Sequence, residues 1–138
     1  MTDSGAFWWE RTRPLPGARP LRTTLRTGHL LAFGALYGGH VYGVDAAALH
    51  PALLATIVTG GTLMALEMYR TPAWPLQVRG LATFAKIALV AAVAAWWEAR
   101  VWLLSAAVVI GGVSSHMPGR LRYYSVFHRR VIGGREAG

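Results

Sequence analysis

The chain has 138 residues, of which 54% are hydrophobic and only 14% are charged, and its formal net charge is +8. Soluble domains carry about 25% charged residues, so this composition predicts a single integral membrane domain without a separate soluble catalytic domain. The chain contains no cysteine. That excludes disulfides, iron–sulfur clusters, thiolate metal sites and a cysteine nucleophile.

Residues 1–28 are polar, basic and rich in proline. They lack the apolar core of a secretory signal peptide, so we expect them to be retained. Pro14, Pro16, Pro20 and Gly17 favour an extended cytoplasmic arm over a long helix. The aromatic run at residues 7–9 predicts an anchor in the lipid headgroup layer, with a docking peptide for a larger partner as the alternative.

Four apolar stretches follow, at approximately residues 29–44, 49–69, 80–97 and 101–118. A bilayer core of about 30 Å needs around 20 apolar residues in a helix. We therefore predict an all-α fold, a four-helix transmembrane bundle formed by residues 1–138 as one domain. The basic and aromatic segment 119–138 is predicted to form a cytoplasmic tail with a helix on the membrane surface.

The basic residues fix the predicted orientation. Twelve of the fourteen lie before the first stretch, between the second and third, or after the fourth. Cytoplasmic loops retain excess arginine and lysine, so both termini are predicted to be cytoplasmic. The same rule explains the high positive charge, so no nucleic-acid partner is expected. The basic tails are expected to contact anionic lipids. Abundant alanine, glycine and arginine suggest the inner membrane of a bacterium.

Ionisable residues within apolar stretches are costly, which makes each one a functional candidate. With this topology, one layer near the cytoplasm contains His29, Glu67, Lys86 and His116. A second layer near the outer face contains His40 and His50.

Imidazole is the usual axial ligand of haem b, and the interior of a helix bundle is a usual place for that cofactor. His29 with His116, and His40 with His50, are therefore candidate ligand pairs, and nearby glycines would admit a flat ring. The alternative is that each histidine, like His128, lies at the interface with one nitrogen in contact with water.

Glu67 and Lys86 have three alternative roles. They can form a structural ion pair, Lys86 can extend to the headgroups, or the two can serve a proton path or a quinone headgroup. No catalytic triad, phosphate-binding loop or dinucleotide fingerprint is present, so no catalytic residue is assigned.

Residues 29–39 (His-Leu-Leu-Ala-Phe-Gly-Ala-Leu-Tyr-Gly-Gly) resemble the first helix of two kinds of small bacterial membrane protein: the copper-resistance D type and b-type cytochrome membrane anchors. In both, a histidine opens the helix and a glycine pair follows. Tyr37 stands where a tryptophan is expected, and no methionine-rich copper motif is present. The resemblance is limited to this helix, and it implies a copper- or haem-associated role with His29 as the first ligand.

We expect a small subunit or anchor of an electron-transfer complex of the respiratory type, with haem b or quinone as candidate cofactor. Other membrane subunits are the expected partners, because a small bundle with small-residue faces and basic tails suits docking better than independent catalysis. One alternative is a transporter for a metal ion or small solute, and another is a structural assembly subunit without cofactor. The sequence does not contain an inverted repeat that would favour transport.

Overall fold

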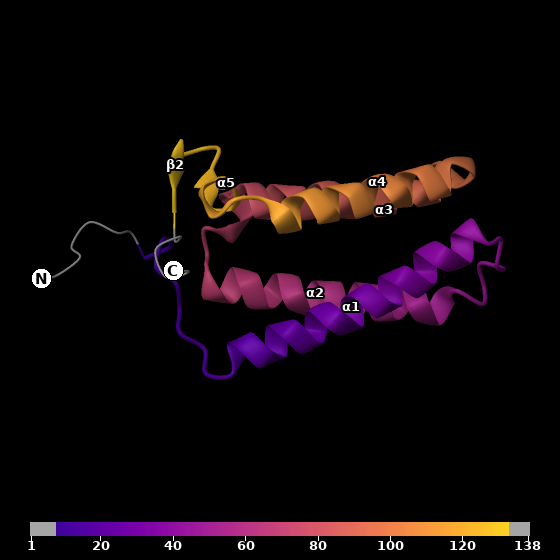
Figure 1. Cartoon of the computed structure of the whole chain (residues 1–138), viewed down its shortest axis with the longest axis horizontal. Coiled ribbons are helices and arrows are strands. Elements are labelled where there is room, and N and C mark those ends of the chain that lie inside the picture. Colours follow the sequence, from indigo (N-terminus) through magenta and orange to yellow (C-terminus); the bar gives the residue numbers. More distant parts are fainter. Residues whose placement is uncertain (1–7, 133–138) are drawn as a thin grey trace, which may run out of the picture.

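The computed structural model describes residues 8–132, and these are mostly helical (Figure 1). The four long helices are α1 (Ala18–Val41), α2 (His50–Arg70), α3 (Val78–Ala95) and α4 (Arg100–His116). Short 3-10 turns, η1 (Trp74–Leu76) and η2 (Trp97–Ala99), lie in the connections before α3 and α4. After α4 come a single turn, α5 (Gly119–Arg122), and an antiparallel pair of strands, β1 (Tyr124–Ser125) and β2 (Arg130–Val131).

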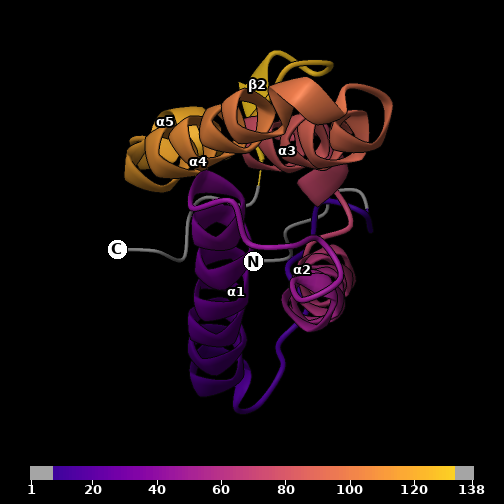
Figure 2. The same cartoon turned by 90° about the vertical axis from the view of Figure 1, so that its right-hand side faces the viewer.

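The four helices are arranged as two helical hairpins. α1 packs mainly on α2, and α3 packs mainly on α4. α1 runs obliquely, so that its C-terminal half approaches α4 while its N-terminal half lies away from it (Figures 1 and 2). α2 and α3 hardly touch. The predicted all-helical character of the apolar part is confirmed, whereas a closed four-helix bundle is not.

The connections and the tail are gathered at two ends of the molecule. The tail end comprises residues 8–17, 71–77 and 117–132, and the turn end comprises residues 42–49 and 96–99 (Figure 1). The long helices connect these two ends.

Within the described residues, three helical segments are long and apolar enough to cross a membrane: α2, α3 and the segment Trp97–His116. They coincide with the last three predicted stretches. α1 is not among them, since its first half contains Arg19, Arg22 and Arg26. A crossing by its second half therefore stays a prediction.

The extended arm predicted to reach residue 28 is wrong for residues 18–28, which are the first part of α1. Gly17 adopts the left-handed conformation, with φ of 71°, at the N-terminal boundary of this helix. Pro20 is the third residue of the helix, within the first turn, where the missing N–H would have no partner within the helix. The proline-rich run thus starts a helix and does not prevent one.

The predicted membrane-surface helix after residue 118 is also wrong. Among residues 119–132, which are the part of this segment that the structure describes, α5 alone is helical, and the chain then forms the β1–β2 hairpin. Ser125 makes an isolated bridge with Gln77, and the Gln77 side-chain nitrogen donates to the Ile132 carbonyl at 2.8 Å. The tail is therefore attached to the α2–α3 connection.

The most enclosed residues are concentrated at the tail end. Gln77 and Ser125 are fully buried, and Ala73, Trp74 and Ile132 are nearly so. In the long helices, by contrast, buried side chains are few, with Leu36, Leu104 and Ala107 the main apolar ones. Such weakly buried apolar helices are expected when lipid, rather than protein, covers their surfaces.

Candidate functional site

A cavity of about 220 Å³ lies at the turn end, where all four long helices contribute to its walls. Its lining is mostly aliphatic, and the only ring-bearing residues are two histidines and a tryptophan. The lining residues are Leu36, His40, Ala46, Leu49, His50, Leu53, Val90, Val93, Ala94, Trp97 and Leu104. The predicted outer pair of His40 and His50 is therefore brought to one site.

Both histidines line this cavity, with His40 partly buried and His50 exposed. His40 packs edge-on against Trp97, with ring centroids 5.5 Å apart. Neither the His40 ring nor the His50 ring has a hydrogen bond to any other described residue. The Arg100 guanidinium covers the Trp97 ring at 5.0 Å and donates to the Trp97 carbonyl at 3.1 Å, which holds this wall in place.

The local sequence explains why His40 and His50 meet. Gly43, with φ of 71°, turns the chain at the end of α1, and the Val44 N–H donates to the Gly39 carbonyl at 2.8 Å. Gly39 has no side chain, so Leu49 packs directly on α1. This close return places the start of α2 beside the end of α1.

His29 lies about three turns inside α1 and does not open it. Its Nδ1 atom is 3.2 Å from the Thr56 carbonyl oxygen and 3.1 Å from the Thr59 hydroxyl, both on α2. The ring lies over Gly60, where a β-carbon would come within 2.8 Å of it. His29 therefore connects α1 to α2.

The predicted pair of His29 and His116 is not formed. His116 is exposed on α4, and its Nδ1 atom is 2.9 Å from the Gly112 carbonyl oxygen of the same helix. His128 lies in the tail, where it approaches the Ser125 hydroxyl at 3.0 Å and packs on Trp9.

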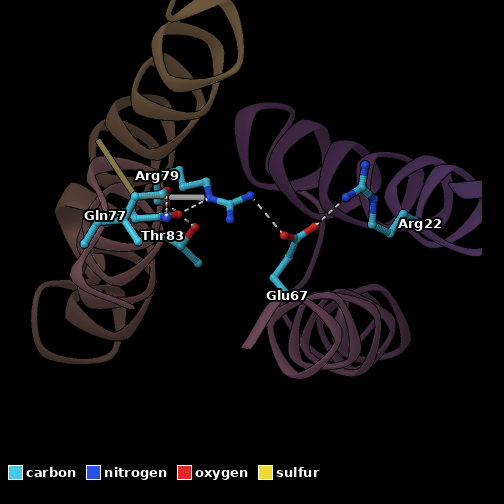
Figure 3. Close-up of polar contacts among 6 residues, drawn as sticks. Arg22, Glu67, Gln77, Arg79 and Thr83 are labelled. Atoms are coloured by element: carbon cyan, nitrogen blue, oxygen red, sulfur yellow. Dashed lines mark hydrogen bonds and ion pairs between the residues drawn. The ribbon is translucent and has the colours of Figure 1, made fainter. Parts of the chain in front are cut away.

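Glu67 lies between two arginines, as Figure 3 shows. Its carboxylate is 3.4 Å from Arg22 on α1 and 3.1 Å from Arg79 on α3. Arg79 also donates to the Gln77 side-chain oxygen at 2.6 Å and lies over the Tyr123 ring at 4.7 Å. Of the alternatives for Glu67 and Lys86, the ion pair between them is not formed, because Arg22 of α1 and Arg79 of α3 occupy the carboxylate.

Sequence reasoning missed three residues that contribute to these sites. They are Trp97, which lines the cavity, and Arg22 and Arg79, which pair with Glu67. The membrane rules for aromatic and basic residues account for all three, so no separate signal marked them. Only the long-range contacts distinguish their roles.

No group of three or more histidine, aspartate or glutamate side chains suited to a metal is present in residues 8–132. Comparisons with known proteins found no matching family model, no matching curated protein and no matching solved structure. The candidate site therefore rests on the geometry of the cavity.

Proposed function

We propose that this protein is a small membrane subunit of an electron-transfer complex and that its turn-end cavity binds the ring of a quinone. The observation that carries the proposal is the pair of histidines, His40 and His50, with free ring nitrogens on an otherwise apolar cavity. Small-molecule sites typically combine apolar walls with a few placed polar groups.

The chemistry of the walls suits a quinone headgroup. An imidazole N–H can donate to a quinone carbonyl oxygen, and Leu36, Leu53 and Val90 can contact the ring faces. Trp97 adds an aromatic surface on which a flat ring can stack. The isoprenoid tail would extend into the surrounding lipid.

The size of the cavity favours a single ring over a macrocycle. Pockets for drug-sized ligands have volumes of about 300–1,000 Å³, and this cavity holds about 220 Å³. Haem b with His40 and His50 as axial ligands is the second candidate for the same place, and it would require α1 and α2 to separate from α3 and α4.

The sparse burial of the helices supports a role as a subunit. Large apolar side chains such as Ile57, Val58 and Val109 are more than half exposed in the isolated chain. Such surfaces are available to lipid and to neighbouring helices alike, and transmembrane helices associate through them.

The test is quinone binding by protein purified in mild detergent, with absorption spectra of the oxidised and dithionite-reduced sample. Decylubiquinone should quench tryptophan fluorescence saturably, and Trp97→Phe should remove much of the quenching. His40→Leu and His50→Leu should each weaken binding about tenfold, because each loses one hydrogen bond to the ring. His116→Leu is the matched control and should bind as the unaltered chain does.

Three outcomes would overturn the proposal. Equal quinone binding by His40→Leu, His50→Leu and the control would place the ring elsewhere. A Soret band that His40→Leu abolishes would assign haem to the cavity. A colourless protein without saturable quinone binding would favour the structural assembly subunit.

A further inference from the structure

Lys86 is the one lysine of the chain, and it lies near the middle of α3. Eight residues separate it from the start of the helix, which places its backbone about 12 Å along the helix axis. The side chain is half-buried, and its stem passes α4 at Gly111, where an added β-carbon would lie 3.8 Å from Lys86 Cδ. This separation is an ordinary van der Waals distance, so the lysine stem lies against α4 at this point.

Within the described residues, the Lys86 ammonium has no counter-charge. Its electrostatic neighbours are Arg26 and His29, which are both basic. It makes no hydrogen bond or ion pair with any residue from 8 to 132. An ammonium that is surrounded only by hydrocarbon is strongly unfavourable, so intramembrane lysines are rare and are usually paired.

The carboxylates of the described chain are all placed elsewhere. Glu67 is held by two arginines, one of α1 and one of α3, and Glu10 pairs with Arg130 at the tail end. Asp45 accepts the Ala47 N–H at 3.2 Å in the turn before α2. Glu98 lies in η2, at the turn end, about three helical turns beyond Lys86.

The ammonium also has an open side. The side-chain nitrogens that are fully enclosed without a partner belong to three arginines, Arg22, Arg70 and Arg122, so the Lys86 nitrogen is accessible. α1 approaches α4 only with its C-terminal half, and α2 hardly touches α3 (Figures 1 and 2). Along the tail-side half of the α3–α4 hairpin, the other hairpin is therefore reached through long side chains, such as Glu67 at Arg79, and not through close backbone packing.

From this charge imbalance we propose that Lys86 pairs with a carboxylate on a transmembrane helix of a partner protein. An acidic side chain at matching depth would supply the missing charge, and both groups would be shielded from lipid. The pairing also fixes the depth and rotation of the partner helix, since each group strongly disfavours the hydrocarbon alone. This inference does not depend on the turn-end cavity.

The test uses a synthetic transmembrane peptide of leucine and alanine with one central aspartate, and matched peptides with asparagine or leucine there. Energy transfer in phosphatidylcholine vesicles reports binding, with the protein labelled at a cysteine introduced at Val126. The aspartate peptide should bind about tenfold more tightly than the leucine peptide. Lys86→Met should abolish this preference, whereas Lys86→Arg should retain it.

Arg120→Met, which removes an exposed charge in α5, is the matched control and should keep the preference. Equal binding of the three peptides by the unaltered protein would overturn the proposal, as would a preference that survives in Lys86→Met. If Lys86→Met instead keeps the peptide preference and loses only an affinity for phosphatidylglycerol, the ammonium pairs with a lipid phosphate and the proposal fails. Each readout is independent of the quinone assay.

Discussion

The histidines show how much the surroundings decide the role of a single residue type. His29 contacts α2 through Thr56 and Thr59, whereas His40, eleven residues later on the same helix, lines the cavity at the turn end. His116 approaches only a carbonyl of its own helix. The sequence treats all three as intramembrane imidazoles, and the difference arises from which helix lies opposite each ring.

The contact between His29 and Gly60 yields a matched pair of variants. Gly60→Ala should destabilise the α1–α2 hairpin by roughly 1–3 kcal/mol, because the new β-carbon would overlap the imidazole ring. Gly61→Ala has no atom within 4 Å of its added carbon and should be neutral or stabilising by up to about 1 kcal/mol. Thermal unfolding in one detergent measures both.

The double variant His29→Ala with Gly60→Ala provides the control for this pair. Removal of the ring makes space for the new methyl group, so the two effects should not add. Equal unfolding temperatures of Gly60→Ala and Gly61→Ala would show that His29 does not pack on α2 in solution.

At the scale of elements, the sequence predicted helix positions well and connections poorly. The apolar stretches 49–69, 80–97 and 101–118 match α2, α3 and α4 within a few residues, since hydropathy and proline positions determine their ends. The first half of α1 was missed because the prolines and Gly17 before and within its first turn were taken to oppose a helix. The β1–β2 hairpin was missed because it depends on Gln77, a residue far away in sequence.

The cavity was predictable only in part. The topology placed His40 and His50 in one layer, and this was sufficient to propose that they act together. Trp97 and Leu104 come from the second hairpin, and they approach α1 because α1 crosses that hairpin obliquely. The hydrophobic periodicity of the sequence does not predict this crossing angle.

The attachment of the hairpin to Gln77 gives a prediction for the tail. Gln77→Leu keeps the size of the side chain but removes its hydrogen bonds to the Ile132 carbonyl and Arg79. Leaving these buried groups unpaired costs about 1–3 kcal/mol, so local opening of the hairpin should increase about tenfold or more. Trypsin should then cleave faster after Arg129 and Arg130.

Val126→Ala is the control for this experiment, because Val126 is half exposed in the hairpin loop and makes none of these hydrogen bonds. Its cleavage rate should match that of the unaltered chain. An unchanged rate in Gln77→Leu would mean that the hairpin is held by other contacts, such as the Arg130–Glu10 ion pair.

For the whole molecule, the number of times the chain crosses the membrane, three or four, decides on which side each end lies. Three helical segments are apolar enough to span the membrane, and α1 combines a basic first half with an apolar second half. The two described ends of the chain lie together at the tail end (Figure 1). Four crossings would leave that end on one side of the membrane, whereas three would place residues 8–17 and 117–132 on opposite sides.

The distribution of arginine favours four crossings. Arg19, Arg22 and Arg26 occupy the tail-side half of α1. Glu67 on α2 forms ion pairs with both Arg22 on α1 and Arg79 on α3. This ion-pair cluster joins α1, α2 and α3, and we therefore predict that α1 crosses the membrane beside the other two. Because basic residues tend to be retained in the cytoplasm, we predict that the whole tail end lies on the cytoplasmic side.

Because the chain has no cysteine, single introduced cysteines can map this arrangement. Ala47→Cys and Glu98→Cys, both exposed at the turn end, should react in intact cells with a maleimide that does not cross membranes. Pro14→Cys and Val126→Cys should react only after permeabilisation, because four crossings keep both on the cytoplasmic side. Reaction of just one of these two in intact cells would establish an odd number of crossings. In that case α1 would lie along the surface, and the cavity between its C-terminal end and α4 could not form at the outer face.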